Sequence, residues 1–279
     1  CWLAGATLAI PDTQQSLSDA LTHFKPTHLS LVPTQLQRLL QHPQSRVALQ
    51  GCTAILLGGP PVSAELIAQA QQAELNIHTS YGATEMSSQI TTTPPGYWLN
   101  HPATPVVSGE LLPHRELRLH QGEVLVRGQT LFQGYRQNGV LQQQQRKDGW
   151  FATGDLGHWH HGQLRINGRK DYQFISGGEN IQPEEIERYL LAFSEVQEAM
   201  VVPVRDHEFG ARPVAFLRLA HGVDAVSFFK ALPDALSQSL PKFKIPQGFY
   251  PWPDTLQTEG LKPRRHTFQR YAQGLYPDG

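Results

Sequence analysis

The sequence has few cysteines, little net charge and no long apolar run. Only Cys1 and Cys52 occur among 279 residues, which excludes a disulfide framework and favours a reducing compartment, here the cytoplasm. The formal net charge is -1, and no basic stretch indicates a nucleic-acid partner or a membrane surface. Because no apolar run is long enough to span a bilayer, we expect no membrane insertion.

The length and composition of the chain are those of a folded protein with more than one domain. Hydrophobic residues make up 39% and charged residues 17% of the chain, which is enough for a sizeable core. The first residues, CWLAGATLAI, include no initiator methionine, charged leader or cleavage-site pattern. We therefore expect the chain to be a piece of a longer protein.

Residues 1–105 alternate short apolar runs with helical patterns. The strand patterns are HLSLVP, AILLGG and NIHTSYG. The helical patterns between them begin at Thr34 and Ser63, which are predicted N-caps. Strand–helix–strand order predicts a parallel sheet covered by helices.

Residues 106–170 change to alternating apolar and polar positions. The alternation turns around Gln121–Gly122 and again around His161–Gly162, and each turn predicts a hairpin. We expect a small antiparallel β-barrel subdomain here.

Residues 171–279 form the third predicted domain, a small α+β C-terminal domain. A helix is predicted from Pro183, followed by strands at AMVVPV and RPVAFLRL. A later helix, DAVSFFKALPDALSQSL, is predicted to kink or break at Pro233. The junction GRKDYQ, residues 168–173, is a candidate hinge.

The stretch FISGGENIQPEEIERY, residues 174–189, places a glycine pair before an acidic helix start. A helix N-terminus attracts anions. Pro183 fits the first turn, and Glu184 and Glu185 already match its positive end. We therefore interpret Gly177–Gly178 as a requirement of backbone shape rather than as a phosphate site.

Two strand-end stretches, LLGGPPVS and SYGATEMSSQ, carry residues suited to a nucleotide, because open α/β sheets bind ligands at the ends of their strands. Tyr81 offers a flat ring, Thr84 a hydroxyl and Glu85 a hard oxygen ligand for magnesium. The alternative is an ordinary turn with a helix cap at Thr84.

The stretch DGWFATGDLG places Asp155 where a carboxylate could accept two ribose hydroxyls; the alternative is an Asx turn. His158, His160 and His161 could suggest zinc, but a hairpin with solvent-facing histidines is favoured, since no further ligand pattern is near. Cys52 is interpreted as a small core residue.

A basic group near the end of the chain contains Lys262, Arg264 and Arg265. It follows a proline-rich stretch, residues 246–253, which suggests a projecting loop. The alternative is a solvated basic turn.

Six motifs occur in the order typical of one enzyme superfamily. They are Gly-Gly-x-Pro, Tyr-Gly-x-Thr-Glu, Gly-Trp-Phe-x-Thr-Gly-Asp, Gly-Arg-x-x-Asp, Gly-Gly-Glu-Asn-Ile-x-Pro-x-Glu-Ile-Glu and a late Lys-x-x-Arg. Over nearly its whole length the sequence resembles the adenylate-forming superfamily of acyl-CoA synthetases, peptide-synthetase adenylation domains and luciferases. Within it, YGATEMSSQI, ISGGENIQPEEIERYL and VPVRDHEFGARPVAF are most similar to the o-succinylbenzoate–CoA ligases of menaquinone biosynthesis.

The resemblance implies an ATP-dependent acid–thiol ligase with the α/β fold of adenylate-forming enzymes. Such enzymes activate a carboxylic acid with ATP to an acyl-adenylate and pass the acyl group to CoA, with Mg²⁺ as cofactor. By similarity, Tyr81 stacks on adenine and Gly58–Gly59–Pro60 line the other side. Gly82 is implied to be a further cofactor-binding residue. Thr84 is implied to bond the α-phosphate and Glu85 to hold Mg²⁺.

The resemblance also implies roles for the later motifs. Asp155 takes the ribose hydroxyls, assisted by Arg169, and Asp171 is the hinge of the last domain. Lys262 bridges the attacking carboxylate and the phosphate. The glycine loop Gly177–Gly178 lines the passage through which the thiol of CoA arrives.

Two features depart from the superfamily pattern. The serine-, threonine- and glycine-rich phosphate loop is absent, so we expect the N-terminal part of the fold to be missing and this chain alone to be inactive. Leu261 stands where many relatives have glycine, which leaves Lys244 as an outside candidate for the role of Lys262.

Ser87, Ser88 and Gln89 are candidates for contacting a second substrate carboxylate.

Two other functions stay open from the sequence. One is a non-catalytic nucleotide- or acyl-binding module, because the phosphate loop is absent. The other is a ligase for a fatty acyl, aryl or amino acyl substrate. A homo-oligomer stays open as well.

Overall fold

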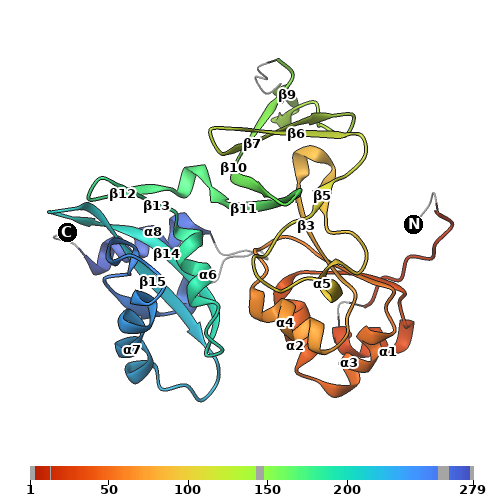
Figure 1. The fold of residues 1–279 in the computed structure, drawn as a ribbon, viewed down its shortest axis with the longest axis horizontal. Helices are drawn as coiled ribbons and strands as arrows, with labels where there is room; N and C mark the ends of the chain where they lie inside the picture. Colours follow the sequence, from red (N-terminus) through yellow and green to blue (C-terminus); the bar gives the residue numbers. More distant parts are fainter. Residues whose placement is uncertain (1–3, 13, 143–147, 257–263, 277–279) are drawn as a thin grey trace. The chain divides into compact units, whose positions relative to one another are not determined.

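The computed structural model describes residues 4–12, 14–142, 148–256 and 264–276 (Figure 1). The chain divides into two compact units. The first unit contains residues 1–153 and 157–166, and the second contains residues 154–156 and 167–279. The division at residues 105 and 170 into three domains stays a prediction.

Most elements of the first unit come from the first 142 residues. They are α1 (Leu17–Phe24), β1 (His28–Leu31), α2 (Pro33–Leu40), α3 (Pro43–Gln50), β2 (Ala54–Leu57), α4 (Ala64–Gln72), β3 (Ile77–Ala83), the 3-10 turn η2 (Thr84–Met86), β4 (Ser88–Thr92), α5 (Tyr97–Asn100), β5 (Glu110–Leu111), β6 (Arg115–His120), β7 (Glu123–Gly128), β8 (Tyr135–Gln137) and β9 (Val140–Gln142). Two further strands, β10 (Phe151–His160) and β11 (Gln163–Arg169), contribute residues to both units.

A five-stranded sheet with the order β1-β2-β3-β4-β5 organises the first unit. Strands β1, β2 and β3 are parallel, with Leu31 opposite Leu57 and Leu57 opposite Thr79. The parallel sheet predicted from the sequence is therefore confirmed for these strands. Strands β4 and β5 are antiparallel to their neighbours, which makes the whole sheet mixed.

The helices of this unit pack their apolar sides onto the parallel strands. Leu36, Ile55, Ile67, Ile77 and Trp98 are among the buried residues of this core. Burial of such side chains is the main stabilising contribution to the fold.

Local signals explain where two of these helices begin. The hydroxyl of Ser63 accepts a hydrogen bond from the amide of Leu66 at 3.1 Å, so the predicted cap of α4 is confirmed. The predicted cap at Thr34 is wrong, because α2 begins at Pro33 with Val32 as its N-cap residue. Proline has the fixed φ that suits the first helical position, so the helix begins at Pro33 and its N-cap lies two residues before Thr34.

Cys52 lies in this core, as predicted, with 6% of its surface exposed. Its thiol donates to the carbonyl of Pro26 at 3.2 Å. Burial raises the pKa of the thiol.

A second sheet has the order β11-β10-β7-β6. Both predicted hairpins are confirmed: Gln121–Gly122 joins β6 to β7, and His161–Gly162 joins β10 to β11. All four turn residues have positive φ values, as type I′ hairpin turns require. Closure of these strands into a barrel stays a prediction.

The second unit is built on one long hairpin. Its elements are the 3-10 turn η3 (Lys170–Tyr172), β12 (Phe174–Ser176), β13 (Glu179–Ile181), α6 (Pro183–Leu190), β14 (Val196–Asp206), β15 (Gly210–Leu219), α7 (Ala225–Ser237), the 3-10 turn η4 (Lys242–Lys244), β16 (Phe249–Pro251), the 3-10 turn η5 (Asp254–Leu256) and α8 (Arg265–Leu275). Strands β14 and β15 are antiparallel, and β16 pairs in parallel with β15.

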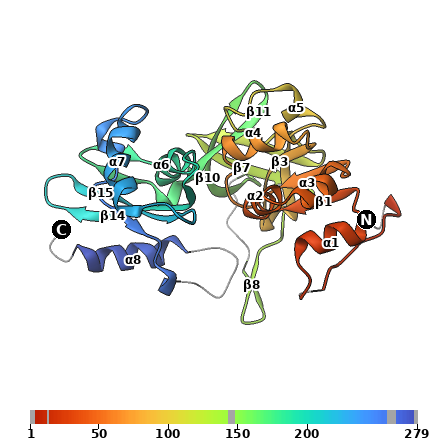
Figure 2. The same ribbon diagram turned by 90° about the horizontal axis from the view of Figure 1, so that it is seen from below.

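Both faces of the β14–β15–β16 sheet are covered. Ala215 and Leu217 pack with residues of α6 and α7, whereas Val214 and Phe216 pack with Phe268 of α8. Figure 2 shows α7 and α8 on opposite sides of β14 and β15. Helix α7 continues through Pro233, so the break is wrong, whereas a kink at Pro233 stays a prediction.

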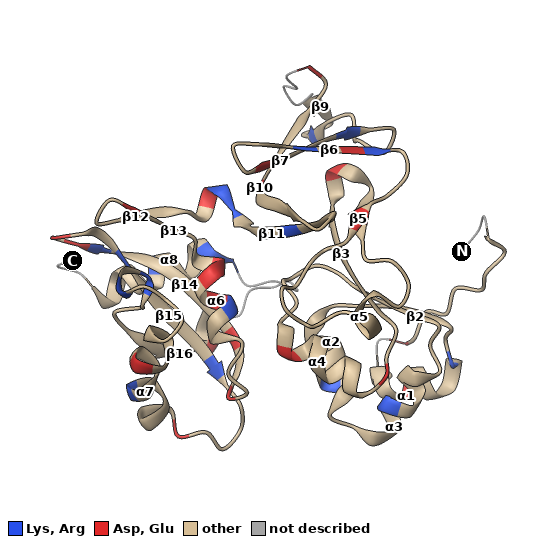
Figure 3. Ribbon diagram, viewed as in Figure 1, with Lys and Arg blue, Asp and Glu red and all other residues tan. Residues whose placement is uncertain are grey.

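Charged residues of both signs are spread over the two units (Figure 3). Strand β6, for example, carries Arg115, Glu116 and Arg118 within four residues. Among the helices of the described ranges, none has both the length and the apolarity that a membrane crossing requires.

Candidate functional site

The carboxyl ends of β2 and β3 bring two predicted nucleotide-binding stretches together in the first unit. Gly58 directly follows β2, and its amide donates to the carbonyl of Leu31 at 3.2 Å. A Cβ on Gly58 would stand 3.3 Å from Oγ of Ser80. The Gly58–Gly59–Pro60 stretch therefore begins beside the residue that precedes Tyr81, at the edge where parallel sheets bind ligands.

The backbone changes course at Tyr81 and Gly82. The β3–β4 register shifts between these two residues, and such bulges redirect side chains next to functional sites. A Cβ on Gly82 would collide with the backbone of Ser88. Glycine is thus needed here for the close approach of β3 and β4, whatever else binds nearby.

Thr84 and Glu85 lie in the short turn η2, between β3 and β4. Thr84 is exposed and Glu85 is half-buried. The alternative reading of Thr84 as a helix cap is wrong, because the N-cap residue of η2 is Ala83. Glu85 is the carboxylate of this turn, and Met86 after it is fully buried.

Sequence reasoning missed a residue that contacts Glu85. The hydroxyl of Tyr135 donates to Oε1 of Glu85 at 2.5 Å, and the amide of Phe132 donates to the carbonyl of Glu85 at 2.7 Å. Tyr135 is fifty residues from Glu85 in sequence, so no local pattern pairs them.

Two of the three candidates for contacting a second substrate carboxylate make side-chain hydrogen bonds within the protein. Ser87 donates to the carbonyl of Thr130 at 3.0 Å. Nε2 of Gln89 donates to Oγ1 of Thr92 at 2.8 Å. Ser88 is exposed. Their role toward a substrate stays a prediction.

In the second unit, Asp155, Arg169 and Asp171 form one cluster. Nη1 of Arg169 lies 3.2 Å from Oδ1 of Asp155, and Nη2 lies 3.0 Å from Oδ2 of Asp171. The Asp155 side chain is 16% exposed and that of Asp171 is 69% exposed. Burial alone would lower the pKa of Arg169, but the carboxylates of Asp155 and Asp171 together outweigh it, so the pKa lies above its ordinary value.

Asp155 lies in a strand and not in a turn. Gly154 and Asp155 are inside β10, so the Asx-turn alternative is wrong. Gly154 has a φ of 75°, and a Cβ there would stand 2.9 Å from Nη2 of Arg169. A residue with a side chain would therefore displace the guanidinium that contacts Asp155.

The acidic start of α6 holds the backbone that carries Arg169. Oε1 of Glu184 accepts from the amide of Arg169 at 3.0 Å, and Nε2 of Gln182 donates to the carbonyl of Arg169 at 2.9 Å. Nε2 of Gln182 also donates to Oε2 of Glu184 at 2.6 Å. A Cβ on Gly168 would stand 2.5 Å from that Nε2. The Gly-Arg motif and the Gln-Pro-Glu motif are thus parts of one contact, which sequence spacing did not reveal.

The glycine pair that precedes α6 forms the turn of the β12–β13 hairpin. Gly177 and Gly178 have φ values of 56° and 86°, in the left-handed region that glycine adopts readily. The amide of Gly177 donates to the carbonyl of Phe209 at 2.9 Å, and a Cβ on Gly177 would stand 2.8 Å from the Phe209 ring. The interpretation of this pair as a requirement of backbone shape is confirmed.

The basic group at the end of the chain is described only from Arg264 onward. Lys262 and Leu261 lie outside the described residues. Arg265 is paired with Glu187 at 2.7 Å, so the alternative of a solvated basic turn is wrong for Arg265. Lys244, the outside candidate, pairs with Glu185 at 2.6 Å and is 17% exposed.

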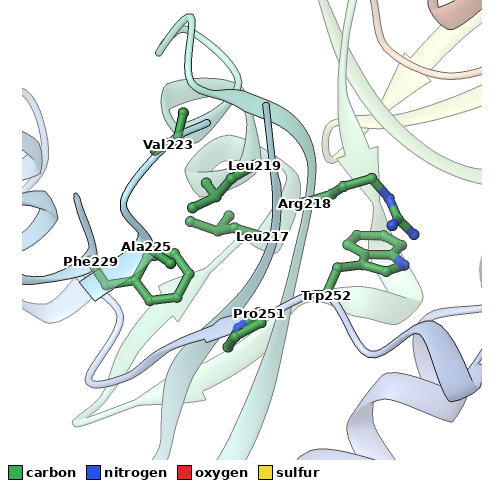
Figure 4. Close-up of a pocket in the computed structure, with 8 residues that line it drawn as sticks. All are labelled: Leu217, Arg218, Leu219, Val223, Ala225, Phe229, Pro251 and Trp252. Atoms are coloured by element: carbon green, nitrogen blue, oxygen red, sulfur yellow. The ribbon is translucent and has the colours of Figure 1, made fainter. Parts of the chain in front are cut away.

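The histidines and the described pocket share no residue with these contacts. The pKa of His160 is lowered by desolvation first and then by His161, Arg165 and His158. Within the described ranges, no cluster of three or more His, Cys, Asp and Glu side chains is arranged to hold a metal ion. A pocket of about 220 Å³, lined by Leu217, Phe229, Trp252 and their neighbours, contains none of the predicted site residues (Figure 4).

The motifs and their geometry agree with comparison to known proteins. The model of the AMP-binding enzyme family matches residues 1–136, and that of the AMP-binding enzyme C-terminal domain matches residues 185–260. The chain belongs to the AMP-binding enzyme family. These enzymes are the adenylate-forming proteins that the sequence motifs indicated.

The relatives in this family include ligases. The chain is 39% identical to the 2-succinylbenzoate–CoA ligase of Salmonella typhimurium over 272 residues, which are 97% of the chain and 56% of that protein. It is 37% identical to the Escherichia coli ligase of the same name over 98% of the chain and 56% of that protein. The chain thus spans about half the length of the curated relatives it matches.

Solved structures give the same picture. An E. coli MenE variant with bound OSB-AMS has a TM-score of 0.77 at 35% identity, over 94% of the chain and 54% of that protein. The Bacillus subtilis o-succinylbenzoate CoA synthetase in complex with ATP and magnesium ion has a TM-score of 0.68 at 30% identity, over 85% and 50%. The anthranilate CoA ligase AuaEII, at 22% identity and a TM-score of 0.81, shares the fold.

Proposed function

We propose that this chain is the larger part of an ATP-dependent ligase that converts o-succinylbenzoate to o-succinylbenzoyl-CoA in menaquinone biosynthesis. The observation that carries the proposal is the 39% identity to a 2-succinylbenzoate–CoA ligase over 97% of the chain. The strand-end position of Gly58 and Tyr81 and the Asp155–Arg169 pair support nucleotide binding.

The first proposed step joins the acid to AMP. A carboxylate oxygen of o-succinylbenzoate attacks the α-phosphorus of ATP, the bond to the bridging oxygen breaks, and pyrophosphate leaves with the electron pair. Tyr81 stacks on adenine, with Gly82 beside it and Gly58–Gly59–Pro60 on the other side. Thr84 bonds the α-phosphate, and Asp155 accepts the ribose hydroxyls beside Arg169. Two anions must meet in this step, so Lys262 is assigned to bridge them.

Magnesium suits the residues around Glu85. Mg²⁺ is commonly held by one or two carboxylates together with substrate phosphates and water. Glu85 supplies one carboxylate, and its Oε2 accepts no hydrogen bond from the described residues, whereas Oε1 accepts from Tyr135. Bound there, Mg²⁺ would neutralise phosphate charge during displacement.

The second proposed step transfers the acyl group to CoA. The thiolate of CoA attacks the acyl carbonyl carbon, a carbon–sulfur bond forms, and AMP leaves with its oxygen. Gly177 and Gly178 carry no side chains, and a Cβ on Gly178 would have no heavy atom within 4 Å. This open turn is proposed to lie along the pantetheine arm, and the rotation that presents it is assigned to a hinge at Asp171.

A panel of acids tests the assignment of the substrate. The chain is first joined to the part of the Salmonella typhimurium ligase that its match does not cover; we call this chimera the completed enzyme. Pyrophosphate release is measured with o-succinylbenzoate, benzoate, anthranilate and a long-chain fatty acid. We expect o-succinylbenzoate to be preferred at least about 100-fold in kcat/KM, since the pocket must match its second carboxylate. Equal turnover of benzoate or the fatty acid would overturn the assignment.

A further inference from the structure

Tyr135 is the side chain that contacts the carboxylate of Glu85. It is the first residue of β8, in the β8–β9 hairpin, and 43% of its surface is exposed. Its hydroxyl donates to Oε1 of Glu85 at 2.5 Å. Within the described part of the chain Oε2 of Glu85 accepts no hydrogen bond, so the contact with Tyr135 orients the carboxylate through Oε1.

Packing and hydrogen bonds fix the segment that carries this tyrosine. The Phe132 ring packs edge-on against the rings of Tyr135 and Phe151. The distances between ring centroids are 4.9 Å to Tyr135 and 5.3 Å to Phe151. The amide of Phe132 donates to the carbonyl of Glu85 at 2.7 Å, and the hydroxyl of Ser87 donates to the carbonyl of Thr130 at 3.0 Å. Phe132 also packs against the cluster that contains buried Met86. The segment from Thr130 to Tyr135 is therefore held against the turn η2 by contacts at Glu85, Met86 and Ser87.

The chemistry of a phenol suits this position. A lysine or arginine at Tyr135 would neutralise Glu85 and compete with a cation for it. A neutral hydroxyl instead donates one hydrogen bond and leaves the negative charge on the carboxylate. Carboxylates that bind metals are themselves commonly oriented by hydrogen bonds, and loss of such a partner typically weakens metal affinity or activity by about 10–100-fold.

We propose that Tyr135 is a positioning residue that orients Glu85 for the metal–nucleotide complex. The inference rests on the proposed function, in that Glu85 faces Mg²⁺ and ATP. It assigns Tyr135 no contact with the reacting atoms. The hydrogen bond removes rotational freedom from the carboxylate before the metal–nucleotide complex arrives, so less ordering remains to be done on binding.

The test compares Tyr135→Phe with unaltered completed enzyme. Phenylalanine keeps the ring that packs on Phe132 and removes only the hydroxyl. Mn²⁺, a paramagnetic probe for Mg²⁺, is titrated by electron paramagnetic resonance in the presence of ATP and without any acid substrate. We expect the Mn²⁺ Kd to rise about 10-fold, while metal-free AMP binding and the melting temperature stay unchanged. Tyr271→Phe, which removes a hydroxyl from another tyrosine that is 40% exposed, is the matched control.

A double-mutant cycle separates positioning from a structural role. In a Glu85→Ala background, Tyr135→Phe should not change Mn²⁺ affinity further, because its partner is gone. Saturating Mg²⁺ should restore kcat of Tyr135→Phe to within about twofold. An unchanged Mn²⁺ Kd, or an equal loss in the Glu85→Ala background, would overturn the inference. Failure to turn over o-succinylbenzoate would instead count against the proposed substrate, because the Mn²⁺ titration contains no acid.

Discussion

The guanidinium of Arg265 and the carboxylate of Glu187 form a bidentate ion pair inside the second unit. Nη1 lies 2.7 Å from Oε1, and Nη2 lies 3.0 Å from Oε2. The amide of Val201 donates to the same Oε1 at 2.7 Å. The two side chains are 10% and 12% exposed, so the contact joins the start of α8 to α6 and β14 in a site largely shielded from water.

Arg265→Ala should destabilise the second unit. It leaves the Glu187 carboxylate buried without its cation, and breaking such a pair typically costs about 3–5 kcal/mol. Chemical denaturation of the chain would measure the free energy of unfolding of this unit. Arg264→Ala is the matched control, because Arg264 is adjacent and exposed, and we expect it to change that free energy by less than about 0.5 kcal/mol. Equal effects of the two substitutions would show that the pair does not stabilise the unit.

Asp155→Asn should weaken nucleotide binding by the chain. A hydrogen bond to a charged group contributes about 1.5–3 kcal/mol, which corresponds to roughly 10–100-fold in Kd. Isothermal titration with AMP would measure this loss, and Asp148→Asn, at an exposed position, is the control. AMP affinity that is identical for both substitutions would remove Asp155 from the nucleotide site.

We also expect the chain by itself, without the added part of the Salmonella typhimurium ligase, to catalyse no ATP–pyrophosphate exchange.

Acid should remove the stabilising contribution of the α7 cap. The Ser227 hydroxyl, followed by the Val226 amide, holds the pKa of Asp224 below its ordinary value. A carboxyl with a depressed folded-state pKa stabilises the fold above its unfolded-state pKa and loses that contribution as pH falls through the folded value. The melting temperature should therefore fall more steeply below about pH 4 in the unaltered chain than in Asp224→Asn. Parallel slopes for the two proteins would contradict this.

Local signals in the sequence identified much of the fold. Ser63 and Pro183 mark helix starts because a hydroxyl cap and a fixed φ act within one turn. Thr34 was mistaken for a cap because the proline before it begins the helix. The alternative of an Asx turn at Asp155 is wrong, because pairing with neighbouring strands outweighs local turn chemistry.

The contacts that the sequence patterns do not predict join residues that are far apart in the chain. Tyr135 reaches Glu85 across fifty residues, and Arg265 reaches Glu187 across seventy-eight. The hydrogen bond from the amide of Arg169 to the carboxylate of Glu184 joins two motifs that their spacing in the sequence does not connect. Such pairs depend on chain topology, which residue spacing alone does not specify.

Lys262→Ala and Gly178→Leu should separate the two half-reactions of the completed enzyme. Loss of the Lys262 cation should slow acyl-adenylate formation by about 10²–10³, because a charge contact in the transition state is removed. Thioester formation from supplied acyl-adenylate and CoA should stay close to normal. Gly178→Leu should show the reverse, since a side chain would obstruct the proposed passage. Rapid-quench assays of each step measure both, and equal slowing of the two steps by Lys262→Ala would make it a structural or nucleotide-anchoring residue.

Product analysis by mass spectrometry shows whether the completed enzyme joins o-succinylbenzoate to CoA. The completed enzyme is incubated with o-succinylbenzoate, ATP, Mg²⁺ and CoA, and the products are identified by mass. We expect o-succinylbenzoyl-CoA and AMP in equal amounts, with acyl-adenylate alone accumulating when CoA is omitted. Hydrolysis of ATP to ADP, or AMP binding without either acyl product, would contradict it and favour a non-catalytic nucleotide-binding module.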